Sequence, residues 1–339
     1  MRLSIFSVVD HYPERQRSIA ALYDQVIAQC VRAEELGFDS FLIAEHHFHE
    51  YGAVPDPVVL LPVLALRTSR IRLGPAVAVL PFRNPIEVAE SYAMVDLLSH
   101  GRLVLGVGSG YLKHEFDGFG IDPAEKRERF DEALSILTRL LSAERVSYDG
   151  RYHTLNDVAL NVAPVQKPHP PIYVAILRKE AAFHVGRSGH RIMSIPYASA
   201  DRFEDVRWII EEFRRGRADA GLSTSPDDAM FAFHCHVAKS DEAARAAASE
   251  AFDLYVATRL YARRQTYDDI LESGLGLFGS VETVAAKLVR LQQWGIRDVA
   301  LLMDFGLMPA DRVHRSMDLV AREVAPKVQA RFQAGTAKP

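Results

Sequence analysis

The sequence predicts an α/β protein folded as a (β/α)8 TIM barrel, with a small hairpin inserted between the fourth and fifth strands. Strand-like and helix-like segments alternate along the 339 residues, and eight strand candidates are each followed by a helical segment. Alternation of this kind favours a parallel sheet, and eight repeats favour closure into a barrel. No Pro/Ser-rich linker or run of charge divides the chain, so we expect a single domain over 1–339. An open doubly wound sheet is the alternative.

The eight predicted strands are short apolar runs bounded by polar or turn-forming residues. They span 3–9, 38–44, 71–80, 103–107, 172–176, 191–195, 230–238 and 299–303.

The predicted helices have apolar residues at helical spacing and end near glycine or polar residues. Phe130, Leu134, Leu137 and Leu141, for example, follow i, i+4, i+7 and i+11. The helices span 19–36, 57–66, 86–98, 130–141, 180–188, 201–220, 241–262, 281–294 and 310–324.

The segment 145–170 interrupts this alternation. Asp149 and Gly150 form a turn signal between polar and aromatic flanks, which predicts the inserted hairpin.

Composition excludes several classes of protein. The 40 basic and 44 acidic residues give a formal charge of −4, which disfavours binding to nucleic acid. No apolar run approaches the ~20 residues of a membrane span, so no membrane association is expected. The N-terminus does not resemble a signal peptide, and Cys30 and Cys235 are too few for a disulfide scaffold. A cytoplasmic protein is therefore expected.

Titratable residues cluster after the second predicted strand, where barrel enzymes place their chemistry. Glu45, His46, His47, His49 and Glu50 fall within six residues. An isolated histidine would be read as a surface residue, but this cluster favours general acid–base chemistry near neutral pH. A metal site is an alternative. However, adjacent histidines in an extended chain point to opposite sides, and the i, i+4 spacing of a helical metal site is missing.

Glycines follow the fourth predicted strand at Gly106, Gly108 and Gly110. The dinucleotide-binding fingerprint needs its third glycine one residue later, so a nicotinamide site is not expected. Glycines here can still form a bed for a planar ring or a phosphate. Arg178 and Lys179 begin the helix after the fifth strand, where free N–H groups and positive charge suit a phosphate.

His234 and His236 lie two residues apart on the seventh predicted strand and therefore face the same side. Metal hydrolases of barrel fold also use His-x-His pairs, usually on the first strand. Here the first strand ends in Ser7-Val8-Val9-Asp10, and Asp304 is the one carboxylate found at the end of the eighth strand. Polar residues that line a substrate site are the favoured interpretation.

Three stretches together resemble one protein family. Residues 45–52 are similar to the Glu-His-His-Phe-Thr-Glu-Phe-Gly segment of the luciferase catalytic subunit. Residues 74–108 and 278–284 also match family patterns, and the likeness is densest over 36–112. The chain thus resembles the bacterial luciferase-like flavin-dependent monooxygenases, whose fold is a (β/α)8 barrel.

The resemblance implies roles for individual residues. His46 takes the position of the catalytic base, with His47 and Glu45 beside it. A non-proline cis peptide between Ala76 and Val77 is expected beneath a flavin ring. The remaining expected cofactor-binding residues are Gly108, Ser109, Tyr111, Leu177, Arg178 and Ile195.

This chain also departs from the family pattern. Gly108 replaces the reactive cysteine of luciferase, and Ser109 replaces a phosphate-binding arginine, whose charge Arg178 is expected to restore. These changes argue against light emission and a long-chain aldehyde substrate. Segment 263–279 falls where the family carries a mobile lid.

The resemblance therefore predicts a two-component FMN-dependent monooxygenase that reacts reduced flavin with O2 and oxygenates a small organic substrate. A separate flavin reductase would supply the reduced FMN, because no nicotinamide site is found. No metal is expected. A homodimer or other oligomer is expected, since luciferase pairs its subunits near Glu90. The alternatives are deazaflavin-dependent hydride transfer, a metal-dependent barrel hydrolase and a flavin-binding protein without catalytic activity.

Overall fold

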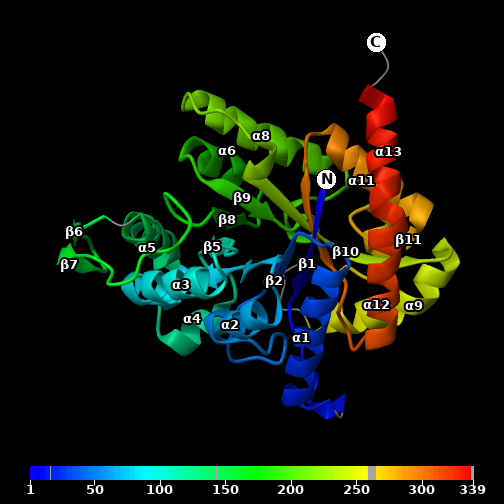
Figure 1. Ribbon diagram of the computed structural model, residues 1–339, viewed down its shortest axis with the longest axis horizontal. Helices are drawn as coiled ribbons and strands as arrows, with labels where there is room; N and C mark the ends of the chain where they lie inside the picture. Colours follow the sequence, from blue (N-terminus) through cyan, green and yellow to red (C-terminus); the bar gives the residue numbers. More distant parts are fainter. Residues whose placement is uncertain (16, 143, 259–264, 337–339) are drawn as a thin grey trace.

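The predicted parallel strands lie at the centre of the molecule and helices surround them (Figure 1). The computed structural model describes residues 1–15, 17–142, 144–258 and 265–336. Within these residues the strands are β1 Arg2–Ser7, β2 Ser40–Ile43, β3 Arg72–Pro75, β4 Ala78–Val79, β5 Leu105–Gly108, β6 Val146–Asp149, β7 Thr154–Val158, β8 Ile172–Ile176, β9 Arg191–Ser194, β10 Ala229–Ala238, β11 Leu277–Ser280 and β12 Asp298–Leu302.

The main sheet is parallel and curls into a barrel. Its strand order is β3-β2-β1-β12-β10-β9-β8-β5-β4, so the first and last long strands of the barrel are neighbours. A parallel bridge between Leu73 and Leu103 joins the two ends of the sheet. The TIM-barrel prediction is confirmed, and the carboxyl ends of the strands meet at one mouth.

Two strand predictions need correction. The run 71–80 is not one strand, because the peptide between Ala76 and Val77 is cis and separates β3 from β4. Strand β11 was not predicted, and it pairs in parallel with the outer half of β10. Its burial comes from packing against β10, which local sequence cannot show.

The barrel is enclosed by helices that begin where apolar periodicity begins. They are α1 Ile19–Glu35, α2 Pro57–Arg67, α3 Pro85–Leu98, α4 Lys113–Phe119, α5 Lys126–Leu141, α6 Glu180–Arg187, α7 Pro196–Ser199, α8 Asp205–Asp219, α9 Asp241–Ala257, α10 Tyr267–Glu272, α11 Val281–Gln293, α12 Ala310–Leu319 and α13 Ala325–Thr336. Side-chain caps fix several starts. Ser18, Asp56, Asn84 and Ser280 each accept a hydrogen bond from a backbone N–H of the first turn.

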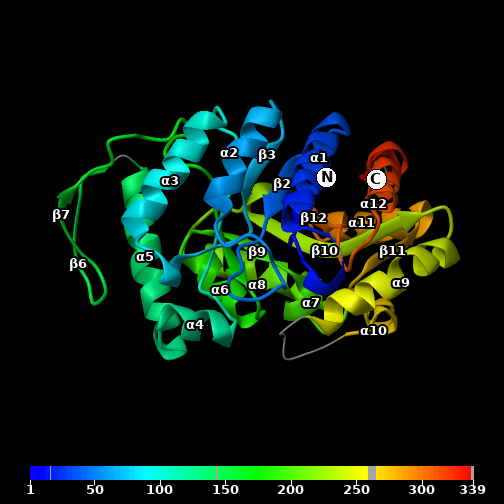
Figure 2. The same cartoon turned by 90° about the horizontal axis from the view of Figure 1, so that it is seen from below.

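The predicted insertion is an antiparallel hairpin of β6 and β7 that extends beyond α5 at one edge of the molecule (Figure 2). Glu132 of α5 binds its turn, accepting hydrogen bonds from the backbone N–H of Arg151 (2.9 Å) and Tyr152 (3.1 Å). The hairpin is thus fixed to the barrel through α5 rather than through the sheet.

The segment predicted as a lid, 263–279, begins outside the described residues. Its described part forms α10 and most of β11. The lid assignment stays a prediction. Within the described residues, none of the helices combines the length and the apolar character needed to cross a lipid bilayer.

Candidate active site

A cavity of about 1020 Å³ opens at the carboxyl ends of the barrel strands. It collects residues from both ends of the chain, because all parallel strands deliver their following loops to this mouth. Of the predicted site residues, those that line it are Glu45, His46, Ala76, Val77, Gly108, Ser109, Tyr111, Leu177, Arg178 and Ile195. His47 does not line the cavity.

His46 is held in place by Glu115 and Tyr51. Its Nδ1 lies 3.2 Å from Oε1 of Glu115, and the same oxygen accepts a hydrogen bond from the backbone N–H of His47 (3.0 Å). The ring also packs on Tyr51 at a centroid distance of 4.3 Å. With Glu115 ionised, Nδ1 carries the proton and Nε2 is the basic nitrogen. Gly52 is needed here, because a Cβ at that position would lie 2.8 Å from the Cβ of His46.

Glu115 was not predicted. It lies in the first turn of α4, 1% exposed, and no local motif distinguishes it from other acidic residues in first turns. Glu115 can position His46 because α4 contacts the loop after β2. Only the folded chain contains that contact.

His47 points away from the cavity. Its Nε2 lies 3.1 Å from Oε1 of Glu45, and its ring packs edge-on against Phe119 at 4.8 Å. Burial raises the pKa of the Glu45 carboxyl, although His47 and Arg83 act in the opposite direction. The Glu45–His47 pair therefore supports the loop that carries His46. Of the two residues, Glu45 lines the cavity.

The centre of the cavity has a flat peptide floor. The cis bond between Ala76 and Val77, expected from the resemblance, is present. Gly108 of β5 lies against it, and a Cβ there would come within 2.6 Å of Cγ2 of Val77. Glycine at 108 thus allows Val77 to pack close to β5. This close approach leaves room for a planar group above the peptide.

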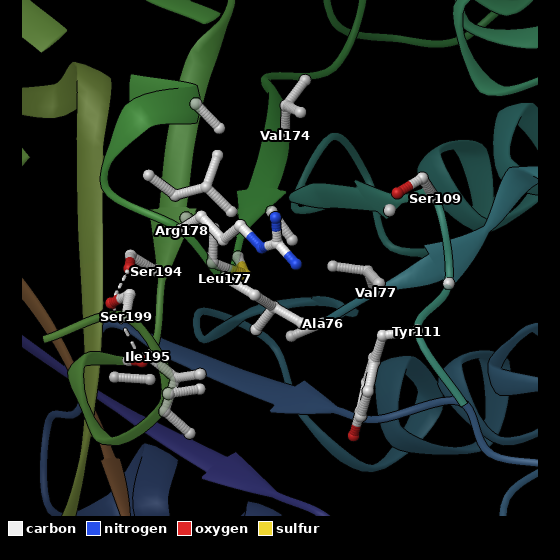
Figure 3. A pocket seen from close by; sticks show the side chains of 18 of the residues that line it. Ala76, Val77, Ser109, Tyr111, Val174, Leu177, Arg178, Ser194, Ile195 and Ser199 are labelled. Carbon is white, nitrogen blue, oxygen red and sulfur yellow. Dashed lines mark hydrogen bonds between the residues drawn. The ribbon is translucent and has the colours of Figure 1, made fainter. Parts of the chain in front are cut away.

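The end of the cavity opposite His46 is basic and rich in hydroxyl groups. Arg178 extends into it from the turn after β8, toward the side on which Ala76 and Val77 lie (Figure 3). Ser194 and Ser199 form a buried hydroxyl pair 2.9 Å apart, and Ser199 also donates to the carbonyl of Ile195 (3.2 Å). These two serines were not predicted, and both line the cavity. Cations and hydroxyls at one end suit a phosphate.

The histidines of β10 do not form a metal site with neighbouring ligands. Among the described residues no group of three or more His, Cys, Asp or Glu side chains is placed to hold a metal ion. Burial lowers the pKa of His234 to about 3 and, together with nearby arginines, the pKa of His236 to about 4.

Comparison with known proteins identifies the family. Residues 1–298 match the model of the luciferase-like monooxygenases. This chain belongs to that family.

Relatives in the family use more than one kind of flavin. Limonene 1,2-monooxygenase of Rhodococcus erythropolis is 29% identical over 307 residues, which cover 86% of this chain and 78% of that protein. The oxygenase component of the flavin-dependent trigonelline monooxygenase of Acinetobacter baylyi is 27% identical, over 74% of this chain and 69% of its own. An F420-dependent glucose-6-phosphate dehydrogenase of Amycolatopsis mediterranei is 34% identical, over 48% of this chain and 51% of its own.

The fold has a close counterpart among solved structures. Monooxygenase RslO1 from Streptomyces bottropensis superposes with a TM-score of 0.89 at 29% identity, covering 96% of this chain and 99% of that chain. The family thus includes flavin-dependent monooxygenases and F420-dependent oxidoreductases, and this chain is an oxidoreductase of that type.

The cavity residues fit a flavin. The volume slightly exceeds the upper end of the range of about 300–1000 Å³ typical of single-ligand pockets. That leaves room for a cofactor and a small substrate together. A flat floor at the centre and a basic end match a planar ring that carries a phosphate tail.

Proposed function

We propose that this protein is the oxygenase component of a two-component FMN-dependent monooxygenase. The observation that carries the proposal is that one cavity has three chemically different parts. It has a basic, hydroxyl-rich end at Arg178, a glycine-backed peptide floor at Ala76–Val77, and a histidine held by a buried carboxylate at His46.

Each part of the cavity would hold one part of the cofactor. Arg178, with the serine pair Ser194 and Ser199, would bind the phosphate. The Ala76–Val77 peptide and Gly108 would support the ring system. When bound, reduced FMN supplies the electrons with which O2 is activated.

The chain's own residues orient groups, move a proton and exclude water. Glu115 holds the proton on Nδ1 of His46, so Nε2 is the atom that accepts or returns a proton during turnover. Apolar side chains of the barrel interior, among them Phe6, Leu42 and Met230, line the deep part of the cavity. A dry interior of this kind protects oxygen chemistry from competing hydrolysis.

The partners follow from this assignment. A flavin reductase would supply reduced FMN, as the trigonelline relative's designation as an oxygenase component suggests. The substrate would be a small organic molecule.

Anaerobic titration of the purified protein with reduced FMN, followed by rapid mixing with oxygenated buffer, tests the proposal. We expect saturable binding and a slow return of the oxidised-flavin spectrum compared with free reduced FMN. Failure to bind reduced FMN would overturn the proposal. Immediate reoxidation that is unchanged by any substrate in a screen would also count against it.

A deazaflavin coenzyme is the second candidate, favoured by the similarity to the F420-dependent dehydrogenase over half of the chain. The same titration with reduced F420 decides between the two, because the preferred coenzyme should bind at least about tenfold more tightly, a difference of about 1.4 kcal/mol.

A further inference from the structure

Lys126 is a charged residue of the cavity that the proposed reaction does not use. It is the first residue of α5, is half-buried, and lines the cavity together with Phe130, one turn later on the same helix. Within the described part of the chain its ammonium group has neither an ion pair nor a hydrogen bond. A cation that faces a cavity without a counter-charge raises the local concentration of anions there.

The charged neighbours of Lys126 over 125–132 do have partners. They pair within the helix or with the inserted hairpin: Arg129–Glu125 at 2.8 Å, Arg127–Asp131 at 2.7 Å, Arg151–Glu128 at 2.6 Å and His153–Glu132 at 2.8 Å. These contacts fix the start of α5. They also leave the charge of Lys126 uncompensated and directed to the cavity side of the helix.

The other cations that line the cavity are accounted for. Arg127 is paired with Asp131, and Arg178 is assigned to the cofactor phosphate. The ammonium group of Lys179 lies 5.8 Å from the ring centroid of Trp208 on α8, beside Arg178 in the chain. A phosphate monoester carries a charge of about −1.5 to −2 near pH 7, which Arg178 and Lys179 together match. Lys126 is therefore additional to what FMN requires.

Lys126 also lies on a different side of the cavity from the hydroxyl pair. The strands are ordered β9-β8-β5 in this part of the sheet. Ser194 ends β9 and Ser199 lies in α7, whereas α5 belongs to the segment that follows β5. The turn that carries Arg178 follows β8 and thus separates Lys126 from Ser194 and Ser199. One phosphate bound at Arg178 and the serines would leave Lys126 available.

No carboxylate of the cavity neutralises Lys126 within the described residues. The acidic side chains among the lining residues are Glu45, Glu115, Glu180, Asp201 and Asp205. Glu115 and Glu45 contact the two histidines at the other end of the cavity, and Asp205 accepts hydrogen bonds from the backbone N–H of Asp201 and Arg202. An anionic group of a ligand can supply the missing charge.

The surroundings of Lys126 suit a ligand whose remaining part is apolar. Phe130, Val174 and Val185 line the adjoining wall and are 3%, 6% and 5% exposed. The deep part of the cavity is apolar as well. A carboxylate held at Lys126 would leave an apolar body to extend toward the peptide floor and His46.

We propose that Lys126 is a specificity-determining residue that binds the carboxylate of an organic anion with an apolar body, and that this anion is the substrate. The carboxylate fixes one end of the substrate, so the reacting part lies over the centre of the cavity. This inference rests on the proposed monooxygenase function, because it assigns Arg178 to the cofactor phosphate.

A pair of matched probes tests this role. 2-Naphthoate and 2-naphthamide share one carbon frame and differ in charge. Their dissociation constants are measured by isothermal titration calorimetry on FMN-loaded protein, for wild type, Lys126→Gln, Lys126→Arg and Lys113→Gln. Lys113 is the control, because it is an exposed lysine of α4 that pairs with Asp117.

We expect wild type to prefer 2-naphthoate, and this preference to fall about tenfold in Lys126→Gln, because one charge-assisted hydrogen bond is lost. It should persist in Lys126→Arg and in Lys113→Gln. The dissociation constant of FMN should stay within about twofold in Lys126→Gln. In the wild type, 2-naphthoate should protect Lys126 from acetylation by acetic anhydride, read by mass spectrometry, whereas 2-naphthamide should not. This last measurement needs no variant that folds.

Three results would overturn the inference. One is an unchanged preference in Lys126→Gln together with unprotected Lys126 in the wild type. Another is a tenfold loss of FMN affinity in Lys126→Gln with riboflavin binding unchanged, which would assign Lys126 to the cofactor phosphate. The third is FMN-loaded wild type that binds neither probe. A protein that fails to bind FMN at all would instead contradict the proposed function, so the two failures can be told apart.

Discussion

The chemistry of the site depends on single side chains whose partners lie far away in the sequence. Glu115 and His46 are separated by 69 positions, and their contact fixes which imidazole nitrogen can take up a proton. At the other end of the cavity the single side chain of Arg178 matters, because its charge lies in the region expected to hold a phosphate.

Replacing His46 with alanine should leave FMN binding within about twofold of wild type and abolish product formation, because the base is lost while the floor and the basic end remain. Binding is measured by fluorescence titration, and product by chromatography once a substrate is known. Normal turnover in His46→Ala would remove His46 from the mechanism.

Glu115→Gln tests the positioning of that base. The amide oxygen can still accept from Nδ1, but the negative charge is lost, so the imidazolium form of His46 is less stabilised. We expect kcat to fall about tenfold and the acidic limb of its pH profile to move to lower pH. The control is Asp117→Asn, which changes an exposed carboxylate of the same helix, paired with Lys113. An unshifted profile would mean that Glu115 acts only in packing.

Arg178→Ala should weaken the binding of FMN about tenfold or more and change riboflavin binding by less than about twofold, because riboflavin lacks the phosphate. Arg187→Ala is the matched control, since Arg187 lies at the end of α6, the helix that follows Arg178, and pairs with Asp219. Equal weakening of both flavins would exclude Arg178 from the phosphate site.

At the scale of elements, the barrel depends on a few buried polar side chains that connect loops at the end opposite the cavity. Arg102, which lies between α3 and β5, is 9% exposed. Its guanidinium donates to the carbonyls of Ser99 (2.7 Å), Ala65 (2.8 Å) and Ile71 (2.9 Å), and so joins the ends of α2 and α3 to the start of β3.

Arg102→Lys should therefore lower the free energy of unfolding by about 2–4 kcal/mol, because one ammonium group cannot reach three separate carbonyls. Urea denaturation measures the loss. Arg70→Lys is the control, since Arg70 is exposed and donates one long side-chain hydrogen bond of 3.4 Å to Glu34. A loss no larger than that of the control would show that water replaces these bonds.

At the scale of the whole molecule, α2 and α3 carry an exposed apolar face. On α2, Val59 and Leu66 are 72% and 77% exposed, and on α3 Met94 is 53% exposed. Glu90, near which luciferase pairs its subunits, lies one turn before Met94. We propose that a second copy of the chain covers this face, because large exposed apolar patches mark association sites.

Leu66→Glu should convert such a dimer to a monomer, as measured by size-exclusion chromatography with light scattering. Leu222→Glu, at an exposed leucine that follows α8, should leave the assembly unchanged. A wild-type protein that is monomeric at micromolar concentration would contradict the proposal.

The sequence by itself determined the barrel, the order of its strands along the chain and the mouth at which the chemistry lies. These follow from local periodicity and from the rule that parallel strands send their carboxyl ends to one side. It also placed His46, Gly108 and Arg178 on loops or strand ends that line the cavity. The cis bond at Ala76–Val77 was expected from family resemblance alone.

Only the tertiary structure decided which side chains meet. It turned His47 away from the cavity toward Glu45, brought Glu115 to His46, and paired β11 with β10. In an extended chain the adjacent residues His46 and His47 point to opposite sides, but the sequence does not show which of them faces the cavity. Their directions depend on the packing of α4 and of the loop after β2, and that packing is a property of contacts between segments distant in the chain.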